Sequence, residues 1–444
     1  MPTRLCAALL VLLCSAGGHA QTLDTATLDL LFDRLLEKNK GMGGLTVARD
    51  GKVLYTRSFG YSLITDARKK PLTADTKYRI ASITKTYTAV MTFQLVEEGR
   101  LKLTDTLDRF FPQIPNASRI TIAHILAHRS GVPDIDADGE FGRQPRTPAE
   151  IVGRIAQGKP YFEPDTMHRY SNAGYNLLGF IVEKAGGRPY QDALRDRITS
   201  KLGLRNTYLG TGKTDPERNE SLSYRYIGGW REAEEVDFSV VGGAGGIVST
   251  TVDMAAFIKG IFDLKLVSKE SLALMTTMRD GEGMGFEPHS FAGRTCYGHT
   301  GGSSSSGAWL TYCPDEKLAL AYATNAKIYP VRDIVAGVFD VYWNRPFQVP
   351  SFEAFKVSPD VLDRYVGIYT VPGTPARMAV TREGGTLFLQ PVGQDRVPLE
   401  ATAENMFQIV PGATVEFDAA KNQMTIKRPQ GERVFTKEKS DPRR

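Results

Sequence analysis

Hydrophobic positions in the first three quarters of the chain alternate between helical and strand spacing. Leucines between residues 22 and 38 recur three and four positions apart, as on a helix. Strand-like runs over 44–49 and 52–56 flank Asp50-Gly51, a dipeptide typical of a hairpin turn. Helices are expected over 82–98, 173–185, 190–202, 251–262, 268–278 and 329–343, and strands over 299–302, 308–312 and 318–324. This order predicts an α+β fold: one antiparallel sheet built from both ends of the region, flanked by helices, with an all-helical insertion.

The last quarter of the chain has a different pattern. Residues 344–358 contain Pro346 and Pro350 and little periodicity, so we interpret them as a linker between a domain at 21–343 and a second domain at 359–444. Short β-like segments separated by glycine and polar turns predict a small β-barrel or sandwich there. These segments are 365–369, 378–381, 386–390, 406–410, 414–417 and 424–427.

The N-terminus has the features of a secretory signal peptide. A short segment with Arg4 precedes an apolar run from Leu5 to Cys14, and Gly18-His19-Ala20 offers small residues where a signal peptidase cuts. An uncleaved anchor is the alternative, but the run is short for a bilayer span. We therefore expect residues 1–20 to be removed and the protein to be exported, either periplasmic or secreted, without a transmembrane segment.

Composition changes this picture little. The 444 residues are 41% hydrophobic and 24% charged, with a formal net charge of +5, so two or three packed domains are expected. No block of like charges is present, which argues against nucleic acid as a partner.

Once Cys6 and Cys14 leave with the signal, Cys296 and Cys313 remain. An exported pair favours a disulfide, with two buried free thiols as the alternative.

Candidate chemistry begins with Ser82-Ile83-Thr84-Lys85. Residues three apart share a helix face, so the Ser82 hydroxyl and the Lys85 amine can meet. A serine needs a base to become a nucleophile, and lysine can be that base only if its pKa falls from about 10.4. By itself the motif is weak, because Ser82 could simply cap the helix.

Two further segments strengthen the hypothesis of a catalytic site. Tyr170-Ser171-Asn172 places a phenol and an amide before a helix, although a buried tyrosine followed by a helix cap would look the same. The segment His299-Thr300-Gly301-Gly302 lies in a strand context, where glycines allow a ligand backbone to approach. A glycine-rich turn is the alternative for that segment.

These three elements, in this order, resemble the serine β-lactamase and D-Ala-D-Ala peptidase superfamily, nearest its class C-like and DD-carboxypeptidase branch. The resemblance runs over about residues 25–343, with supporting matches at 125–131, 161–164 and 242–250. It implies an α/β/α sandwich and no cofactor or metal. The segment from residue 359 onward resembles the small lipocalin-like domain often appended to these hydrolases.

The resemblance also implies a role for each candidate residue. Ser82 would be acylated, Lys85 and Tyr170 would share proton transfer, and Asn172 would bind the acyl side chain. The backbone N–H groups of Ser82 and Gly302 would form the oxyanion hole. The segment containing His299, Thr300 and Gly301 would contribute to substrate binding.

Three positions depart from the family pattern. His299 stands where class C β-lactamases carry lysine, and histidine is mostly neutral at pH 7, which weakens recognition of a substrate carboxylate. Arg129 replaces a usual threonine beside Ser130-Gly131, and Asp165 replaces a usual glycine after Pro164. The histidine at position 299 favours a DD-peptidase, D-amino-acid amidase or esterase that acts on a peptide or small molecule, with β-lactamase as the alternative.

Two functions without efficient hydrolysis are alternatives to an enzyme that turns over its substrate. A penicillin-binding sensor that is acylated but deacylates slowly would keep the same residues, as would a cell-wall interaction protein with a vestigial site.

His124 and His128 have the spacing of a metal pair on a helix, but no third ligand is evident, so packing or capping is the stronger interpretation. His168 is interpreted as a loop residue near Tyr170. The sequence leaves the oligomeric state open.

Overall fold

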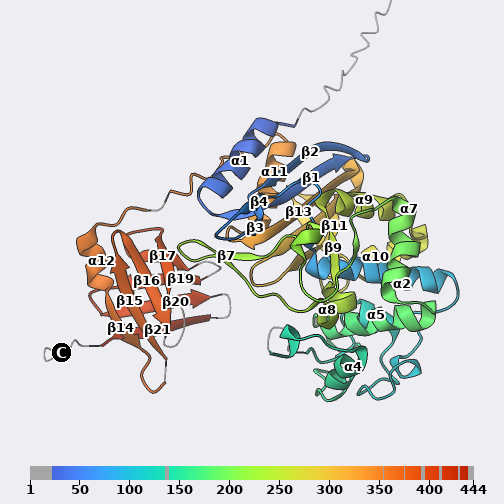
Figure 1. The fold of residues 1–444 in the computed structure, drawn as a ribbon. Helices are drawn as coiled ribbons and strands as arrows, with labels where there is room; N and C mark the ends of the chain where they lie inside the picture. The colour runs from blue at the N-terminus through green and yellow to red at the C-terminus, as the bar shows by residue number, and fades with distance from the viewer. Residues whose placement is uncertain are drawn as a thin grey trace, which may run out of the picture.

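The computed structural model describes residues 23–135, 140–353, 355–374, 376–391, 396–409, 413–428 and 431–438. Its central feature is a six-stranded antiparallel sheet in the order β10-β11-β12-β13-β1-β2 (Figure 1). The sheet therefore joins strands from both ends of the first region, as predicted. Its strands are β1 (Gly41–Arg49), β2 (Lys52–Phe59), β10 (Glu287–Phe291), β11 (Arg294–Gly302), β12 (Gly307–Cys313) and β13 (Leu318–Lys327).

Alternating side chains of β13 pack against two different helical layers, because successive strand residues point to opposite faces. Leu318, Leu320 and Tyr322 belong to the core that includes α1 (Thr25–Glu37) and α11 (Val331–Tyr342). The intervening Ala319, Ala321 and Ala323 belong to the core on the other side, which includes α9 (Thr251–Phe262). The result is the helix–sheet–helix sandwich expected of the fold class.

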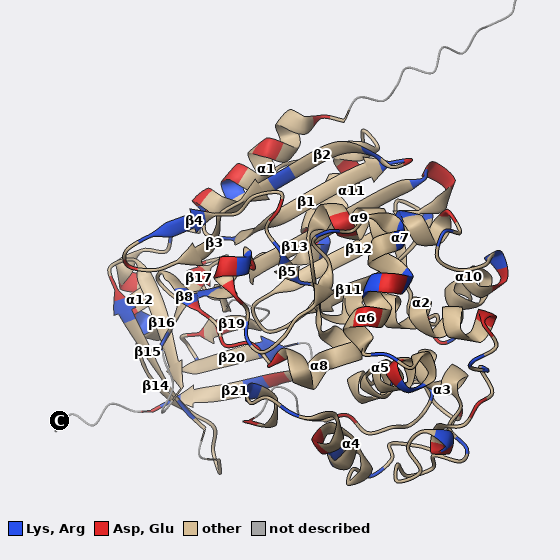
Figure 2. Ribbon diagram, turned by 45° about the vertical axis from the view of Figure 1, so that its right-hand side comes forward, with Lys and Arg blue, Asp and Glu red and all other residues tan. Residues whose placement is uncertain are grey.

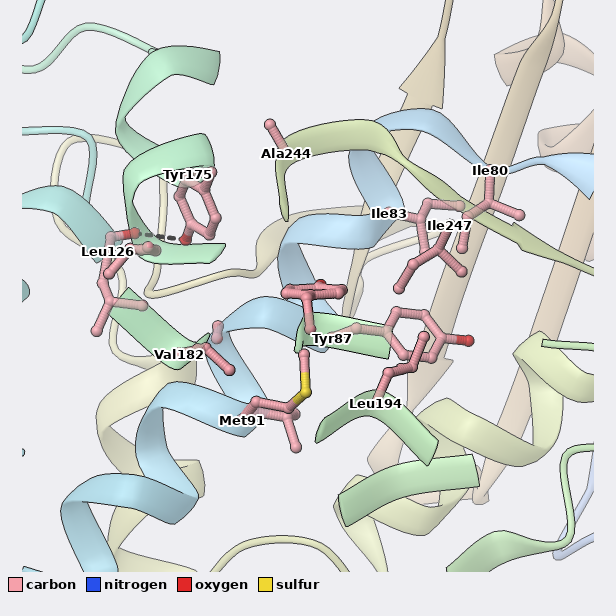
Figure 3. Close-up of a cluster of buried hydrophobic side chains, with 14 of the residues drawn as sticks. Ile80, Ile83, Tyr87, Met91, Leu126, Tyr175, Val182, Leu194, Ala244 and Ile247 are labelled. Atoms are coloured by element: carbon pink, nitrogen blue, oxygen red, sulfur yellow. Dashed lines mark hydrogen bonds between the residues drawn. The ribbon is translucent and has the colours of Figure 1, made fainter. Parts of the chain in front are cut away.

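The helical insertion is built around α2 (Thr84–Glu97), a helix buried along almost its whole length. Tyr87 of α2 stacks on Phe257 of α9, and Tyr175 donates a hydrogen bond to the carbonyl of Leu126 (Figure 3). Its other α-helices are α3 (Ile122–Leu126), α4 (Pro148–Ala156), α5 (Asn172–Gly186), α6 (Tyr190–Leu194), α7 (Ser200–Leu202), α8 (Phe238–Gly245) and α10 (Lys269–Thr276). Shorter helical turns are η1 (Ala81–Ile83), η2 (Leu107–Arg109), η3 (Glu140–Arg143), η4 (Arg195–Thr199), η5 (Pro216–Arg218) and η6 (Pro314–Glu316).

Three small sheets complete this region. One has the order β5-β9-β6, and the other two are the hairpins β3-β4 and β7-β8. Their strands are β3 (Tyr61–Ile64), β4 (Lys69–Pro71), β5 (Tyr78–Arg79), β6 (Tyr208–Leu209), β7 (Tyr224–Tyr226), β8 (Trp230–Glu232) and β9 (Ile247–Ser249).

The C-terminal part is a closed eight-stranded barrel, in which β14 pairs with both β15 and β21. The helix α12 (Pro359–Tyr365) precedes it and buries Leu362 and Tyr365 in the barrel core. The strands are β14 (Gly367–Thr370), β15 (Arg377–Glu383), β16 (Thr386–Pro391), β17 (Val397–Ala401), β18 (Met406–Ile409), β19 (Ala413–Asp418), β20 (Gln423–Arg428) and β21 (Gly431–Lys437).

Several local expectations need correction. Tyr365 was expected at the start of a strand, but it ends α12, since its ring packs inward on Phe417. The single helix expected over 190–202 is instead α6, a wider π turn at Arg195–Thr199, and α7. His128 was expected on a helix with His124, yet α3 ends at Leu126 and His128 has a positive φ of 54°.

Charge and covalent features agree with the sequence. Blue and red segments are interspersed over both parts of the molecule in Figure 2, so no face of one sign stands out in that view. Cys296 and Cys313 form a disulfide between β11 and β12, as expected. The proposed signal, including Cys6 and Cys14, lies outside the described residues. None of the helices in the described part is long and apolar enough to cross a membrane.

Candidate active site

Ser82 lies in a tight turn between β5 and α2. The expected helix start at Ser82 is a 3-10 turn, η1, that leads into α2 at Thr84. Ala81 has a φ of 46°, a left-handed conformation that is costly for a residue with a Cβ atom. Ile80 and Ile83, which flank Ala81 and Ser82 in the chain, are buried and lie beside Ile247 (Figure 3). The fold thus keeps Ser82 in a strained turn at the N-terminal end of α2.

Lys85 is fully buried and surrounded by oxygen atoms. Its Nζ lies 3.0 Å from Ser82 Oγ, and it donates hydrogen bonds to Asn172 Oδ1 at 2.8 Å and to the Ala244 carbonyl at 2.9 Å. Burial lowers the pKa of Lys85 to about 7, because desolvation penalises the ammonium form more than nearby carboxylates favour it. A large fraction of Lys85 is therefore neutral near pH 7.

Tyr170 lies beside the same two residues. It precedes α5, whose N-cap Ser171 accepts a hydrogen bond from the Gly174 N–H. Lys85 Nζ is 4.7 Å from the centroid of the Tyr170 ring. Burial raises the pKa of Tyr170, and this effect outweighs the lowering by its hydrogen bond with Ser82. Tyr170 is consequently a neutral phenol at ordinary pH.

Strand β11 passes directly behind the Ser82 turn. A Cβ atom at Gly301 would lie 2.2 Å from the Ile80 carbonyl oxygen, so only glycine permits this approach. A cleft of about 280 Å³ opens next to it, with Ser82, Asn172, Gly302 and Ser303 among its lining residues. His299, Thr300 and Gly301 are not among the described residues that line this cleft.

His299 and Thr300 interact instead with a carboxylate on the neighbouring strand β10. The Thr300 N–H and hydroxyl donate to Glu287 at 2.8 and 3.1 Å, and His299 Nδ1 lies 3.5 Å from Glu287 Oε1. Burial lowers the pKa of His299 to about 4 despite that carboxylate. Burial alone would raise the pKa of Glu287, but the adjacent imidazoles and the Thr300 N–H lower it to about 2. At neutral pH this side of the site thus holds a neutral histidine and an ionised glutamate.

Some residues around Ser82 were missed by the sequence analysis. Asp134 lines the cleft and accepts a hydrogen bond from the Ala173 N–H at 2.7 Å. Glu282 and Glu287 act electrostatically on both Lys85 and Tyr170. A single acidic residue in a loop or at a strand end has no periodicity or spacing that indicates function, so the sequence carried no signal for these three.

The histidines noted in the sequence do not form a metal site. His124 Nδ1 accepts a hydrogen bond from the Thr121 N–H, which completes a capping box at α3. His128 is stacked on Tyr170, with ring centroids 4.3 Å apart. Within the described ranges, no group of three or more His, Cys, Asp or Glu side chains is arranged to hold a metal ion.

Comparison with known proteins identifies relatives of this chain. Residues 28–338 match the family model described as beta-lactamase. The chain is 30% identical over 435 residues to a penicillin-binding protein of Bacillus subtilis (strain 168), covering 89% of this chain and 95% of that one. It is 32% identical over 212 residues to the esterase EstB of Burkholderia gladioli, which spans 44% of this chain and 53% of the esterase.

A solved structure shows the same relationship. The D-amino acid amidase of Ochrobactrum anthropi SV3, solved with D-phenylalanine, has a TM-score of 0.64 and 26% identity, and the match covers 72% of this chain and 99% of the amidase. The family, the penicillin-binding relative and the amidase together make this chain a β-lactamase-fold hydrolase with a C-terminal barrel. The chain therefore belongs to the serine β-lactamase/transpeptidase superfamily.

Proposed function

We propose that this protein is an exported serine hydrolase that cleaves amide or ester bonds through an acyl-enzyme on Ser82. The observation that carries the proposal is the set of contacts around Lys85 Nζ. A neutral lysine has two N–H groups and one lone pair. The carbonyl oxygens of Asn172 and Ala244 accept the two hydrogens, which leaves the lone pair for the Ser82 hydroxyl.

Acylation follows from this arrangement. Lys85 takes the Ser82 proton while Ser82 Oγ forms a bond to the substrate carbonyl carbon, and the carbonyl electron pair moves onto its oxygen. The backbone N–H groups of Ser82 and Gly302 are assigned to that oxyanion. As the tetrahedral intermediate collapses, the bond to the leaving nitrogen or oxygen breaks, and the leaving group takes a proton that Lys85 returns by way of the Tyr170 phenol. Water then repeats the sequence to release the acid.

The neutral state of Tyr170 favours a proton-transfer role over a phenolate base. A phenol whose pKa is raised by burial is not ionised at neutral pH, so it can pass on a proton but cannot act as a phenolate base. Its hydroxyl is hydrogen-bonded to Ser82, and Lys85 Nζ lies 4.7 Å from its ring centroid. Lys85 is thus assigned as the base and Tyr170 as the donor to the leaving group.

The charges near His299 favour particular substrates. A neutral His299 and an ionised Glu287 offer no cation to a substrate carboxylate on that strand. This favours D-amino-acid amides and esters, which carry no carboxylate beside the scissile bond, over β-lactams and peptides that end in a free carboxylate, in keeping with the amidase and esterase relatives. The penicillin-binding relative keeps a β-lactamase, or a sensor that deacylates slowly, as the second candidate.

The test compares Ser82→Ala with Ser118→Ala, an exposed serine outside the cleft. Each protein is incubated with a D-amino-acid amide, a nitrophenyl ester, a D-Ala-D-Ala peptide and a fluorescent penicillin. We expect Ser82→Ala to lose at least about a thousandfold in kcat/KM, whereas Ser118→Ala matches the parent. Equal turnover by Ser82→Ala would refute the mechanism, and penicillin labelling without turnover would support the sensor instead.

A further inference from the structure

Arg129 and Asp165, two of the positions that depart from the family pattern, are bound to each other. Arg129 Nε lies 2.6 Å from Asp165 Oδ1, and Arg129 Nη2 donates to the Asp165 carbonyl at 2.5 Å. The Arg129 side chain is only 7% exposed. Asp165 has a φ of 66°, the conformation for which glycine is the usual choice. The arginine thus holds a non-glycine residue in a conformation that it would otherwise avoid.

The same pair holds a turn from a distant part of the chain, residues 279–282. Arg129 forms an ion pair with Asp280, and Arg279 Nη1 lies 2.7 Å from Asp165 Oδ1. Within the turn, the Arg279 N–H donates to the Glu282 carbonyl at 2.9 Å. Four charges of alternating sign therefore fix the 279–282 turn against the segment before Tyr170.

The turn places Glu282 beside two histidines. Glu282 Oε2 is 2.9 Å from His168 Nε2 and 3.8 Å from His128 Nε2, and its side chain is 18% exposed. His128 Nδ1 accepts a hydrogen bond from the Ser171 N–H at 3.0 Å, so Nδ1 carries no proton. A neutral His128 must then carry its proton on Nε2, the nitrogen that faces Glu282.

His128 in turn touches Tyr170. Their rings are stacked at an interplanar angle of 22°, and the N–H that His128 receives belongs to the residue directly after Tyr170. The charged and titratable groups around His128 are Glu282, Lys85, His299 and His168, with the phenol rings of Tyr170 and Tyr175 against it. Burial is the main cause that lowers the pKa of His128 well below its ordinary value, and the neighbouring Lys85, His299 and His168 act in the same direction. The ring thus stays neutral and keeps this hydrogen bond.

We propose that His128 and Glu282 are positioning residues for Tyr170, and that Arg129 and Asp165 hold the turn that carries Glu282. The proposal rests on the proposed function of Ser82 and Tyr170. The two departures from the family pattern then act as one unit: they fix the turn, and the turn fixes Glu282. The Ser171 N–H sets the tautomer of His128, and the Glu282 carboxylate, 3.8 Å from the protonated Nε2, attracts that side of the ring and holds its orientation. His128 sets the angle at which Tyr170 meets Ser82.

The test replaces His128 by Gln and uses His124→Gln as the control. Glutamine at position 124 can still complete the capping box of α3, so this variant should match the parent. We expect His128→Gln to lower kcat about ten- to hundredfold with KM changed less than about twofold, because misplacing a proton donor slows chemistry more than binding. Single-turnover acylation by the penicillin probe should slow in parallel.

A second pair of variants guards against a folding defect. Glu282→Gln keeps the shape of the side chain, and the exposed Glu270→Gln serves as its control. Burial raises the pKa of Glu282, so its carboxylate becomes protonated at acid pH. In the parent, this protonation and that of Lys85 both lower activity. The slope of log(kcat/KM) against pH should therefore steepen from one towards two at acid pH. In Glu282→Gln the slope should stay at one.

The outcomes separate this proposal from the proposed function. If folded His128→Gln and Glu282→Gln keep the parental kcat and pH profile, the positioning role is wrong even though Ser82 remains essential. If Ser82→Ala is active, the proposed function itself fails. Variants that only lower the melting temperature, with unchanged kcat per folded molecule, would overturn the positioning role and leave a structural one.

Discussion

At the scale of single residues, the environment of Lys85 matters more than its spacing from Ser82. A Ser-x-x-Lys sequence brings a hydroxyl and an amine onto one helix face, but an ordinary lysine remains protonated at neutral pH. Complete burial and two carbonyl acceptors convert the amine into a group that can accept a proton. Burial likewise keeps Tyr170 a neutral phenol and His299 a neutral imidazole.

The pKa of Lys85 predicts how activity depends on pH. Only neutral Lys85 can take the Ser82 proton, and its pKa is about 7, so the reactive form is lost as pH falls below 7. We expect kcat/KM to fall about tenfold per pH unit below that value, before other groups titrate, and to level off above it. A pH series of initial rates checks this, and Lys85→Arg should remove activity at every pH. A flat profile from pH 5 to 8 would show that Lys85 is not the base.

His299 offers a prediction about substrate choice. Lysine at this position would restore a cation, but Glu287 would neutralise much of it, since its carboxylate lies against the imidazole. We therefore expect His299→Lys to lower the KM for a D-Ala-D-Ala peptide only slightly, and the double variant His299→Lys/Glu287→Gln to lower it several-fold more. The KM for a nitrophenyl ester without a carboxylate is the control. No gain in either variant would contradict our interpretation of this strand.

At the scale of secondary-structure elements, a strand next to the edge of the sheet carries part of the proposed site. Strand β11 supplies Gly302 to the cleft and Gly301 to the close contact with Ile80. The disulfide ties the start of β11 to the end of β12, because Tyr297 pairs with Tyr312 and places Cys296 opposite Cys313. The bond thus fixes the register of the strand that carries the proposed oxyanion donor.

The disulfide should contribute measurably to stability. The two cysteines are 17 positions apart, and closing a loop of this size restricts the unfolded chain by about 3 kcal/mol in the chain-entropy description. We expect Cys296→Ala/Cys313→Ala to unfold at lower denaturant concentration by about that amount. Reduced parental protein should show the same loss, and a double variant as stable as the oxidised parent would contradict the prediction.

At the scale of the whole molecule, the barrel contacts the hydrolase region at defined places. Lys40, which precedes β1, forms an ion pair with Glu400 of β17. The segment that joins the two parts also binds the barrel, because the Phe355 N–H donates to the Ala401 carbonyl. A cavity of about 440 Å³ lies between the two parts and is lined from the hydrolase side by Ser304, Ser305 and Lys327. The barrel is therefore adjacent to the loop that follows Gly302.

The Lys40–Glu400 pair predicts how the two parts hold together. The side chains of Lys40 and Glu400 are 14% and 29% exposed. Such a pair contributes about 1 kcal/mol to the free energy of docking, which changes the equilibrium between docked and undocked barrel about fivefold. We expect Lys40→Glu to speed proteolytic cleavage within residues 344–358, and Lys40→Glu/Glu400→Lys to restore the parental rate. The exposed Lys52→Glu on β2 is the control. Cleavage at the parental rate in Lys40→Glu would show that the pair does not hold the barrel.

The sequence by itself determined the features that depend on local spacing. Alternation, helical periodicity and the Asp50-Gly51 turn predicted the antiparallel sheet with its helical insertion. The three motifs predicted that Ser82, Lys85 and Tyr170 belong to one candidate site. These succeed because hydrophobic period and short-range spacing are properties of neighbouring residues. Most of the barrel strands were predicted for the same reason, whereas α12, β17 and β21 were missed, since each buries only one or two side chains and shows no clear hydrophobic period.

Only the tertiary structure decided the properties that depend on distant contacts. The charge states of Lys85 and His299 follow from burial, which a linear sequence does not display. The pairing of Arg129 with Asp165, and the approach of Glu282 to His128, join segments far apart in the chain. Spacing therefore supplied the candidate chemistry of this protein, and packing determined which groups carry charge, which face the cleft and which hold the others in place.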